Sequence, residues 1–234
     1  VSHCHPAKFP MPLHALFRAL GGLIPSAGAV ASAGRGEKVR LVGGGWRSVA
    51  LAAGAVKAVC EVTVQTPAKE WAVGDYYEVG SVKGVVVWVD ESKLKGKIIS
   101  LDETTADVWS TSNRTTGAQS TTDGKGNTAK VKALDNSLAS FPAFKWCVEK
   151  GEGWYLPASD EVKCFLAIAP VINAVLTEHG GTALDSYYWS STESDSNSET
   201  NAYWIYGYNG STTTNDDSKT APEGPNFVRA MYQF

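Results

Sequence analysis

Alternating hydrophobic and polar positions predict β-strands early in the chain and again near its end. Four early segments are rich in Val, Ile, Tyr or Trp and are bounded by turn residues: 53–65, 71–77, 84–90 and 97–102. Three late segments follow the same rule: 187–192, 202–208 and 226–232. Between the two groups, residues 106–128 are rich in Ser, Thr and Gly and predict a long loop.

Helical spacing of apolar residues occurs twice in the middle of the chain. Residues 133–150 predict a first helix that Pro142 should interrupt. A second helix is predicted from Leu156 to His179, kinked at Pro170, with an apolar stripe at Val162, Phe165, Leu166, Ala169, Ile172 and Leu176. This order predicts an α+β fold with mixed or antiparallel sheets, two helices and a long polar loop region.

Charge divides the chain into two parts. Residues 1–60 hold seven bases and one acid, whereas the rest is acidic and the whole chain has a net charge of −3. We therefore expect a poorly determined N-terminal segment at 1–66 and a second domain at 70–234. Residues 53–65 resemble the last strand of a bacterial immunoglobulin-like repeat. One interpretation of the first segment is therefore a remnant of such a repeat, and the alternative is an unusual leader.

The composition also excludes some partners and chemistries. A slightly negative chain favours neither nucleic acid nor anionic lipid, and no apolar run reaches the length of a membrane span. The grouping His3-Cys4-His5 with His14 matches no closed zinc site, and four histidines leave little material for a catalytic set. Cys147 and Cys164 are expected to be buried free thiols, with a disulfide as the alternative. We therefore expect no enzyme activity, cofactor or metal.

The segment between the last predicted strands has an unusual composition. It consists almost wholly of Ser, Thr, Asn, Asp, Gly and Tyr. Tyr provides contact area at low entropic cost, and small polar residues provide adaptable hydrogen bonds, so the composition is typical of a binding surface. The alternative is an ordinary solvated loop, although such a loop has no need of repeated aromatic residues.

Several motifs in the second domain match a known pattern in order and spacing. They are Gly153-Trp154-Tyr155-Leu156-Pro157, Glu161, Tyr188-Trp189-Ser190-Ser191-Thr192-Glu193 and Val228-Arg229-Ala230. The domain resembles the C-type-lectin-fold domains of gut Bacteroidetes and their phages, in the group related to formylglycine-generating enzymes. One departure is Ala158, where the family often has a capping Ser. Glu161 should then retain the interaction with the helix dipole and at most one backbone bond.

Many members of this group are variable proteins of diversity-generating retroelements, in which adenines near the end of the gene are mutated. The resemblance implies a variable region at about 184–234. Trp189, Glu193, Trp204, Lys219 and Arg229 would be scaffold, with Trp189 and Trp204 in the core and Glu193 and Arg229 as candidates for an ion pair. The implied ligand-binding positions are Tyr187, Ser194, Ser196, Asn197, Asn201, Tyr203, Tyr206, Tyr208, Asn209, Ser211, Thr213, Asn215, Asp217 and Asn226.

The resulting hypothesis is a non-enzymatic ligand- or receptor-binding protein, extracellular, at a cell surface or on a phage particle. Its partner would be a protein or glycan on another cell or host, with no nucleic acid and no membrane insertion, and the oligomeric state stays open. The alternative is a structural or adhesive subunit of a surface fibre or pilus. An enzyme related to the formylglycine-generating group would need a late reactive cysteine, and none follows Cys164.

Overall fold

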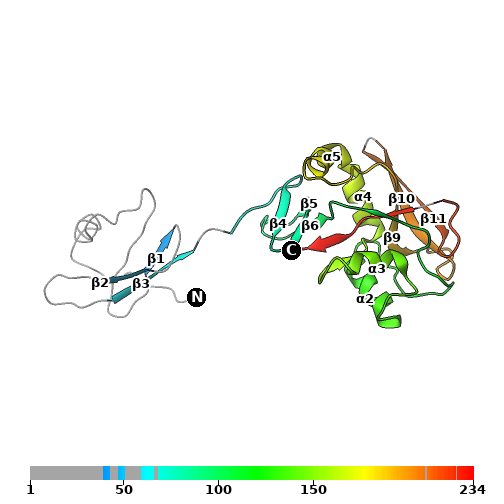
Figure 1. Ribbon diagram of the computed structural model, residues 1–234, viewed down its shortest axis with the longest axis horizontal. Helices are drawn as coiled ribbons and strands as arrows, with labels where there is room; N and C mark the ends of the chain where they lie inside the picture. The colour runs from blue at the N-terminus through cyan, green and yellow to red at the C-terminus, as the bar shows by residue number, and fades with distance from the viewer. Residues whose placement is uncertain (1–38, 43–46, 51–58, 66–67, 209, 225) are drawn as a thin grey trace. The chain divides into compact units, whose positions relative to one another are not determined.

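The computed structural model describes residues 39–42, 47–50, 59–65, 68–208, 210–224 and 226–234. The chain divides into two compact units, Val1–Lys69 and Glu70–Phe234 (Figure 1).

Three short strands form the described part of the first unit. They are β1 (Val39–Val42), β2 (Arg47–Ala50) and β3 (Val59–Gln65). The central strand β3 pairs in parallel with β1 and antiparallel with β2. The strand predicted at 53–65 is therefore present over 59–65, while its first residues and the His3-Cys4-His5 grouping lie outside the described residues.

The first sheet of the second unit contains the two ends of that unit. Its strands, in spatial order, are β4 (Tyr76–Val79), β5 (Val82–Val89), β6 (Gly96–Ile99), β13 (Met231–Gln233) and β8 (Trp154–Tyr155). All its pairings are antiparallel. The last strand of the chain thus lies between an early strand and the Trp-Tyr motif, which fixes the start and end of the unit against each other.

The second sheet carries most of the tail. Its spatial order is β11 (Ser211–Ser218), β10 (Asn201–Tyr208), β9 (Tyr187–Glu193), β12 (Asn226–Val228) and β7 (Thr104–Ala106). Only the pairing of β12 with β9 is parallel in this sheet. The prediction of one strand at 226–232 was wrong, because Arg229 and Ala230 separate two strands that belong to different sheets. The early prediction at 71–77 was placed too early, since β4 covers Tyr76–Val79.

The described residues contain four helices, not the two that the sequence predicted. The first predicted helix, at 133–150, is present only as α3 (Pro142–Val148), and α2 (Gly124–Leu134) is a helix that lies almost wholly before it. Helix α2 begins inside the predicted loop, where the Asp123 carboxylate accepts a hydrogen bond from the Gly126 amide at 2.8 Å. Pro142 starts α3 instead of interrupting a longer helix, since proline is well tolerated in a first turn.

The second predicted helix is also two helices, α4 (Ser159–Ala167) and α5 (Ala169–Glu178). They meet at Ile168, and Pro170 lies in the first turn of α5, so the expected kink is a complete break. The apolar stripe nevertheless faces the core as predicted, with all its members buried except the half-buried Ala169.

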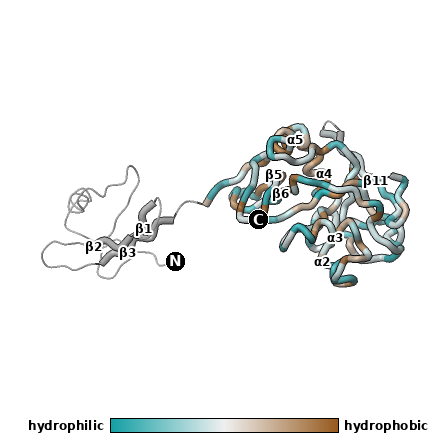
Figure 2. Tube along the Cα trace, viewed as in Figure 1, coloured by the Kyte–Doolittle hydropathy of each residue, from teal (hydrophilic) through white to brown (hydrophobic). Residues whose placement is uncertain are grey.

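Two apolar clusters fill the second unit, one on each side of β9. One cluster joins α4 and α5 to β5, β6 and the Tyr188–Ile205 side of the second sheet. The other joins α2 and α3 to the Trp189–Val228 side. Figure 1 shows α4 and α5 on one side of β9–β11 and α2 and α3 on the other. Brown and teal alternate over short distances along this unit in Figure 2, as expected where elements bury only one face.

Candidate ligand-binding surface

Strand registers bring several predicted contact residues into one row across the second sheet. Thr213 pairs with Tyr206, and Tyr206 pairs with Tyr187. Because β12 pairs in parallel with β9 at Phe227 and Tyr188, the preceding residue Asn226 lies beside Tyr187. Paired residues in neighbouring strands point to the same face. Four predicted positions therefore share one face of the sheet.

Three aromatic rings form the centre of this surface. Tyr187 stacks on Tyr206 with ring centroids 4.7 Å apart, and its edge meets Trp204 at 5.1 Å and 86°. Tyr187 is 46% exposed, and the other two residues are half-buried. We call Tyr187, Trp204 and Tyr206 the aromatic ledge. Trp204 was expected in the core. It contributes both to the core and to the ledge, because it also packs against the apolar cluster beneath it.

Polar side chains extend the ledge to the sheet edge. Thr213 and Asn215 lie on β11 opposite Tyr206 and Trp204, and both are exposed, as is Ser211 at the start of the same strand. Asp217 follows on the same face of β11 and is half-buried. Its carboxylate accepts hydrogen bonds from the amides of Ser218 and Glu223, at 2.7 and 2.9 Å. Asp217 therefore shapes the loop that follows β11.

Two buried polar atoms lie on the inner side of the ledge. Asn226 is 5% exposed and Trp189 is fully buried. Among the described residues, neither Asn226 Nδ2 nor Trp189 Nε1 has a hydrogen-bond partner. Such atoms are uncommon in protein interiors. Asn226, predicted as a contact residue, is thus almost covered in this structure, and Trp189 belongs to the core as expected.

Several other predicted positions lie at the opposite end of the strands, around the β9–β10 connection. Tyr203 sits at the irregularity between Ala202 and Trp204, and its hydroxyl accepts a hydrogen bond from the Asp195 amide at 3.1 Å. Ser194 is buried, at 1% exposure, and its hydroxyl meets that of Ser196 at 3.0 Å. These residues therefore surround the β9–β10 connection and do not join the ledge.

Two further predicted residues near that connection have different environments. Asn197 is exposed, whereas Asn201 is half-buried with its amide 3.4 Å from an Asp216 carboxylate oxygen. Tyr208 is part of β10, but its side chain and all of Asn209 lie outside the described residues.

A buried ion pair holds the β9–β10 connection in place. Lys219 Nζ lies 2.6 Å from Glu193 Oε1, and both side chains are fully buried. The same ammonium donates to the carbonyls of Arg114 and Ser198, at 2.9 and 2.6 Å. Burial lowers the pKa of Lys219. Glu193 also accepts from the Thr116 amide and hydroxyl. One charge pair thus connects three loops.

Arg229 has a different partner from the one that the sequence predicted. The expected Glu193–Arg229 pair was wrong, because Glu193 pairs with Lys219 while Arg229 pairs with Glu103. The guanidinium also donates to the carbonyls of Ser100, Leu101 and Thr182. It is fully buried and sits between the two sheets, at the step from β12 to β13. Nothing in the sequence identified Glu103 as the partner of Arg229. Glu103 lies far from Arg229 in the chain and simply follows a predicted strand.

Glu161 has more partners than its sequence context suggested. Its carboxylate accepts from the Ala158 amide at 2.9 Å and from the Gly124 amide at 3.0 Å. Tyr155 donates its hydroxyl to it as well, and Lys97 forms an ion pair with it. Without a Ser side chain at position 158, only one of the two hydrogen bonds of a capping box is absent, because the bond from the Ala158 amide to Glu161 remains. This cluster joins the starts of α2 and α4.

A small cavity lies beside that cluster. Its volume is ≈ 190 Å³, and its lining includes Trp88, Lys97 and Cys164. Cys164 is free and half-buried, and Cys147 is free and buried. Burial raises the pKa of both thiols, which disfavours the reactive thiolate. Within the described residues, no three His, Cys, Asp or Glu side chains gather closely enough to hold a metal ion.

In the part of the chain that the structure describes, every helix is too short or too polar to cross a membrane.

Models of known protein families give no match to this chain, and no curated protein is similar to it in sequence.

Proposed function

We propose that this chain is a non-enzymatic binding protein whose second unit presents the aromatic ledge and the polar face of β11 to a ligand. We further propose that this unit is a C-type lectin fold and that the tail is a diversified surface, as in variable proteins of retroelements. The protein would act outside the cell, at a cell surface or on a phage particle.

The observation that carries the proposal is the exposed stack of Tyr187 on Tyr206 with Trp204 at its edge. Monomeric proteins seldom leave large aromatic side chains grouped on a sheet face without a use. Rigid aromatic residues surrounded by Ser, Thr and Asn are the composition of binding surfaces that adapt to many partners. The exposed residues Ser211, Thr213 and Asn215 supply that polar surround.

The arrangement of buried charges supports a fixed scaffold beneath a changeable surface. Glu193, Lys219 and Arg229 are fully buried, and each has several specific partners. Replacing any of them would leave a buried charge unpaired, which is strongly destabilising. Tyr187, Thr213 and Asn215 can change without disturbing such partners, because their side chains extend from the surface.

The proposal is tested by sequencing this locus in many members of a natural population. We expect substitutions derived from adenine to concentrate at Tyr187, Tyr206, Thr213 and Asn215, while Glu193, Lys219 and Arg229 stay constant. A uniform spread of substitutions, or no excess of adenine-derived changes in the last fifty codons, would contradict diversification.

A binding measurement tests the ligand-contact part separately. Cells or purified surface proteins that the wild-type chain binds should lose that binding when Tyr187 and Tyr206 are both replaced by Ala. Retained circular dichroism and unchanged thermal unfolding would show that the variant is folded. Unchanged binding by a folded variant would instead favour an exposed loop with no contact role.

A further inference from the structure

We propose that the ledge takes its ligand as an extended polypeptide segment, which pairs with the edge of β11 as an added strand. The partner is a segment of another protein that carries an aromatic side chain opposite Thr213. This inference rests on the proposed function, since it names the kind of ligand that the same surface would bind. It depends on the backbone groups that β11 leaves without a partner.

Strand β11 is the longest edge strand among the described residues of the second unit. The other edge strands of the two sheets, β4, β7 and β8, have four, three and two residues, whereas β11 has eight. Its pairing with β10 runs without irregularity from Ser211 to Ser218. The strand also contains no proline or lysine, two residues that discourage further pairing at a sheet edge. Its length and composition therefore suit the addition of another strand.

Alternate residues of β11 turn their backbone groups away from β10. The Lys219 amide donates to the Thr200 carbonyl at 2.7 Å, which continues the register that pairs Ser218 with Asn201. Because the bonded residues alternate in an antiparallel pair, the odd-numbered residues of β11 bond to β10. The even-numbered residues face the open edge with their amides and carbonyls, and they are Thr212, Thr214, Asp216 and Ser218.

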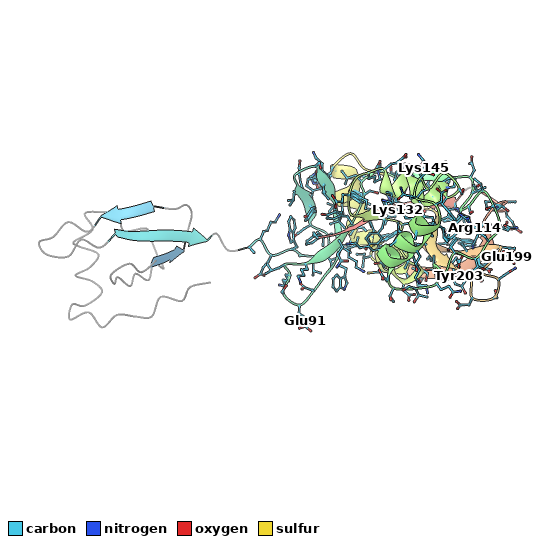
Figure 3. The ribbon with its side chains drawn as sticks, turned by 90° about the horizontal axis from the view of Figure 1, so that it is seen from below. Glu91, Arg114, Lys132, Lys145, Glu199 and Tyr203 are labelled. Carbon is cyan, nitrogen blue, oxygen red and sulfur yellow. The ribbon has the colours of Figure 1, made fainter. Side chains whose placement is uncertain are left out.

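The C-terminal half of this edge is closed by side chains of the strand itself. The Asp216 amide donates a hydrogen bond to the Asn215 side-chain oxygen at 2.9 Å. The Ser218 amide donates to the Asp217 carboxylate at 2.7 Å. Tyr203 marks this half in Figure 3, because it pairs with Asp216. A strand added here would find both amide donors already bonded.

The N-terminal half of the edge is open. Among the described residues, the outward amides and carbonyls of Thr212 and Thr214 have no hydrogen-bond partner. Thr214 is exposed and Thr212 is half-buried. We call Thr212–Thr214 the open segment. Its backbone groups are the ones that an added strand would bond to, since main-chain hydrogen bonds supply the affinity in this mode of peptide recognition.

The open segment lies beside the aromatic ledge. Its central residue, Thr213, pairs with Tyr206 and points to the same face. A residue of the added strand opposite Thr213 would share that face, about 10 Å from β10 at the spacing of two strands. Because Thr213 is small, an aromatic side chain at that position can extend over it to the Tyr206 ring. The backbone bonds and the ledge contact thus fit one bound segment.

A second copy of this chain would not use the ledge in this way. Pairing of two open segments would place a Ser, Thr or Asn side chain of β11 opposite Thr213, and none of these is long enough to reach Tyr206. A pairing of three residues also buries far less than the roughly 800 Å² per partner of a stable interface. The open segment therefore fits a different chain with a long side chain.

The test selects peptides that bind the folded full-length chain from a random-sequence library and measures one selected peptide by fluorescence polarisation. Each amide of that peptide is then N-methylated in turn. We expect methylation at every second residue of the bound part to weaken binding by about tenfold or more, and methylation between them to change it by less than about threefold. The selected pool should also be enriched in aromatic residues.

Hydrogen exchange on the wild-type chain locates the added strand. Bound peptide should slow exchange of the Thr212 and Thr214 amides by about tenfold or more, because each gains a hydrogen-bond partner. Exchange at Thr213 should change less, because that amide already bonds to Tyr206.

A proline variant blocks the open segment. Thr214→Pro removes an outward donor but leaves the bonds to β10, so it should weaken binding by about tenfold or more. Thr214→Ala keeps the amide and should change binding by less than about twofold. Glu78→Pro is the matched control at the edge strand β4 and should also change it by less than about twofold. The Glu78 amide faces away from β5, because bonded residues alternate from Asp75, whose carbonyl accepts from the Val86 amide.

Circular dichroism and thermal unfolding show whether these variants are folded. The methylation scan and the exchange measurement use the wild-type chain, so they decide the question if Thr214→Pro does not fold.

The outcomes separate this inference from the proposed function. Binding that Y187A/Y206A abolishes, without alternation in the methylation scan and without slower exchange at Thr212 and Thr214, would overturn the added strand and leave the binding surface standing. Binding that depends on Thr214 but not on the two tyrosines would support the added strand and overturn the ledge as its contact. A chain that selects no peptide would overturn the inference, and a dimer that Thr214→Pro dissociates would then assign the edge to a second copy.

Discussion

The two faces of the β9–β10 strand pair both carry a tyrosine, but the two tyrosines lie in opposite environments. Tyr187 and Tyr188 are neighbours, yet Tyr187 is 46% exposed on the ledge and Tyr188 is fully buried. The Tyr188 hydroxyl donates to Glu103 at 2.7 Å, and its ring contacts Phe165 of α4 edge-on. Strand β10 shows the same difference. Ile205, which pairs with Tyr188, is buried, whereas Tyr206, which pairs with Tyr187, stacks on it.

This contrast shows how a polar, Tyr-rich segment can be both rigid and exposed. The inner face supplies packing energy, and the buried pairs Lys219–Glu193 and Arg229–Glu103 fix the loops and the sheet junction. On the other face, Trp189 belongs to the second apolar cluster, and only the exposed side chains of Tyr187, Thr213 and Asn215 contribute little to stability and are free to vary. The inner and outer faces should therefore respond very differently to substitution.

The largest effect is expected at the buried end of the strands, in Lys219→Met. The change leaves Glu193 without its counter-charge and two loop carbonyls without a donor, so we expect a loss of about 3–5 kcal/mol in the free energy of unfolding. Urea unfolding measures it. Lys163→Met is the matched control, because its pair with Asp160 is partly exposed and should be worth less than about 1 kcal/mol.

Hydrogen exchange adds a local readout for the same variant. The amides of Trp109 and Ser110 donate to the Lys219 carbonyl, and the Lys219 amide donates to Thr200. Faster exchange is expected at these positions. A loss below about 1 kcal/mol, no greater than that of the control, would mean that the pair does not fix the loops.

The second comparison places Ile205→Ala beside Tyr206→Ala. Ile205 is fully buried against α4, so its truncation should cost about 3 kcal/mol of unfolding free energy. Tyr206 loses only part of a surface stack, which should cost about 1 kcal/mol. Ligand binding should show the reverse order, with Tyr206→Ala the more damaging. Equal effects of the two changes on stability would contradict the division into two faces.

Apolar patterning was enough to predict the inner face. The stripe on α4 and α5 is buried, and the alternation at 187–192 and 202–208 matches β9 and β10 with errors of one residue. Helices α4 and α5 bury one regular set of apolar residues, and that is the property which a sequence displays most directly; β9 is instead buried at every residue except Tyr187.

The outer face and its anchors could not be predicted in the same way. Strand β11 reads Ser-Thr-Thr-Thr-Asn-Asp-Asp-Ser and has no apolar alternation, because it is an edge strand held by its pairing with β10. Helix α2 begins with Gly-Lys-Gly, a sequence typical of a loop. In the structure, Asp123 and Glu161 accept hydrogen bonds from the first amides of this helix. The partners of Lys219 and Arg229 are distant in sequence, so only the fold identifies them.

The smallest effect concerns ionisation of the inner tyrosine. Burial is the main cause of the raised pKa of Tyr188, with Glu103 acting in the same direction and Arg229 against it. The folded protein then keeps a proton that the unfolded chain releases above about pH 10, so stability should fall as the pH rises through that value. One such group can contribute up to about 1.4 kcal/mol for each pH unit.

Tyr188→Phe separates this contribution from the rest of the protein. Near neutral pH, the variant reports only the loss of the hydroxyl bond to Glu103, because the phenol is protonated in both states. Between about pH 10 and 11, stability of the wild type should fall more steeply than that of the variant, by about 1 kcal/mol. The lowered pKa of Lys219 acts with the opposite sign, but it is common to both proteins and cancels in the difference. Parallel pH profiles in urea unfolding would mean that Tyr188 is as accessible as its neighbour on the ledge, and the two faces would then not be distinct.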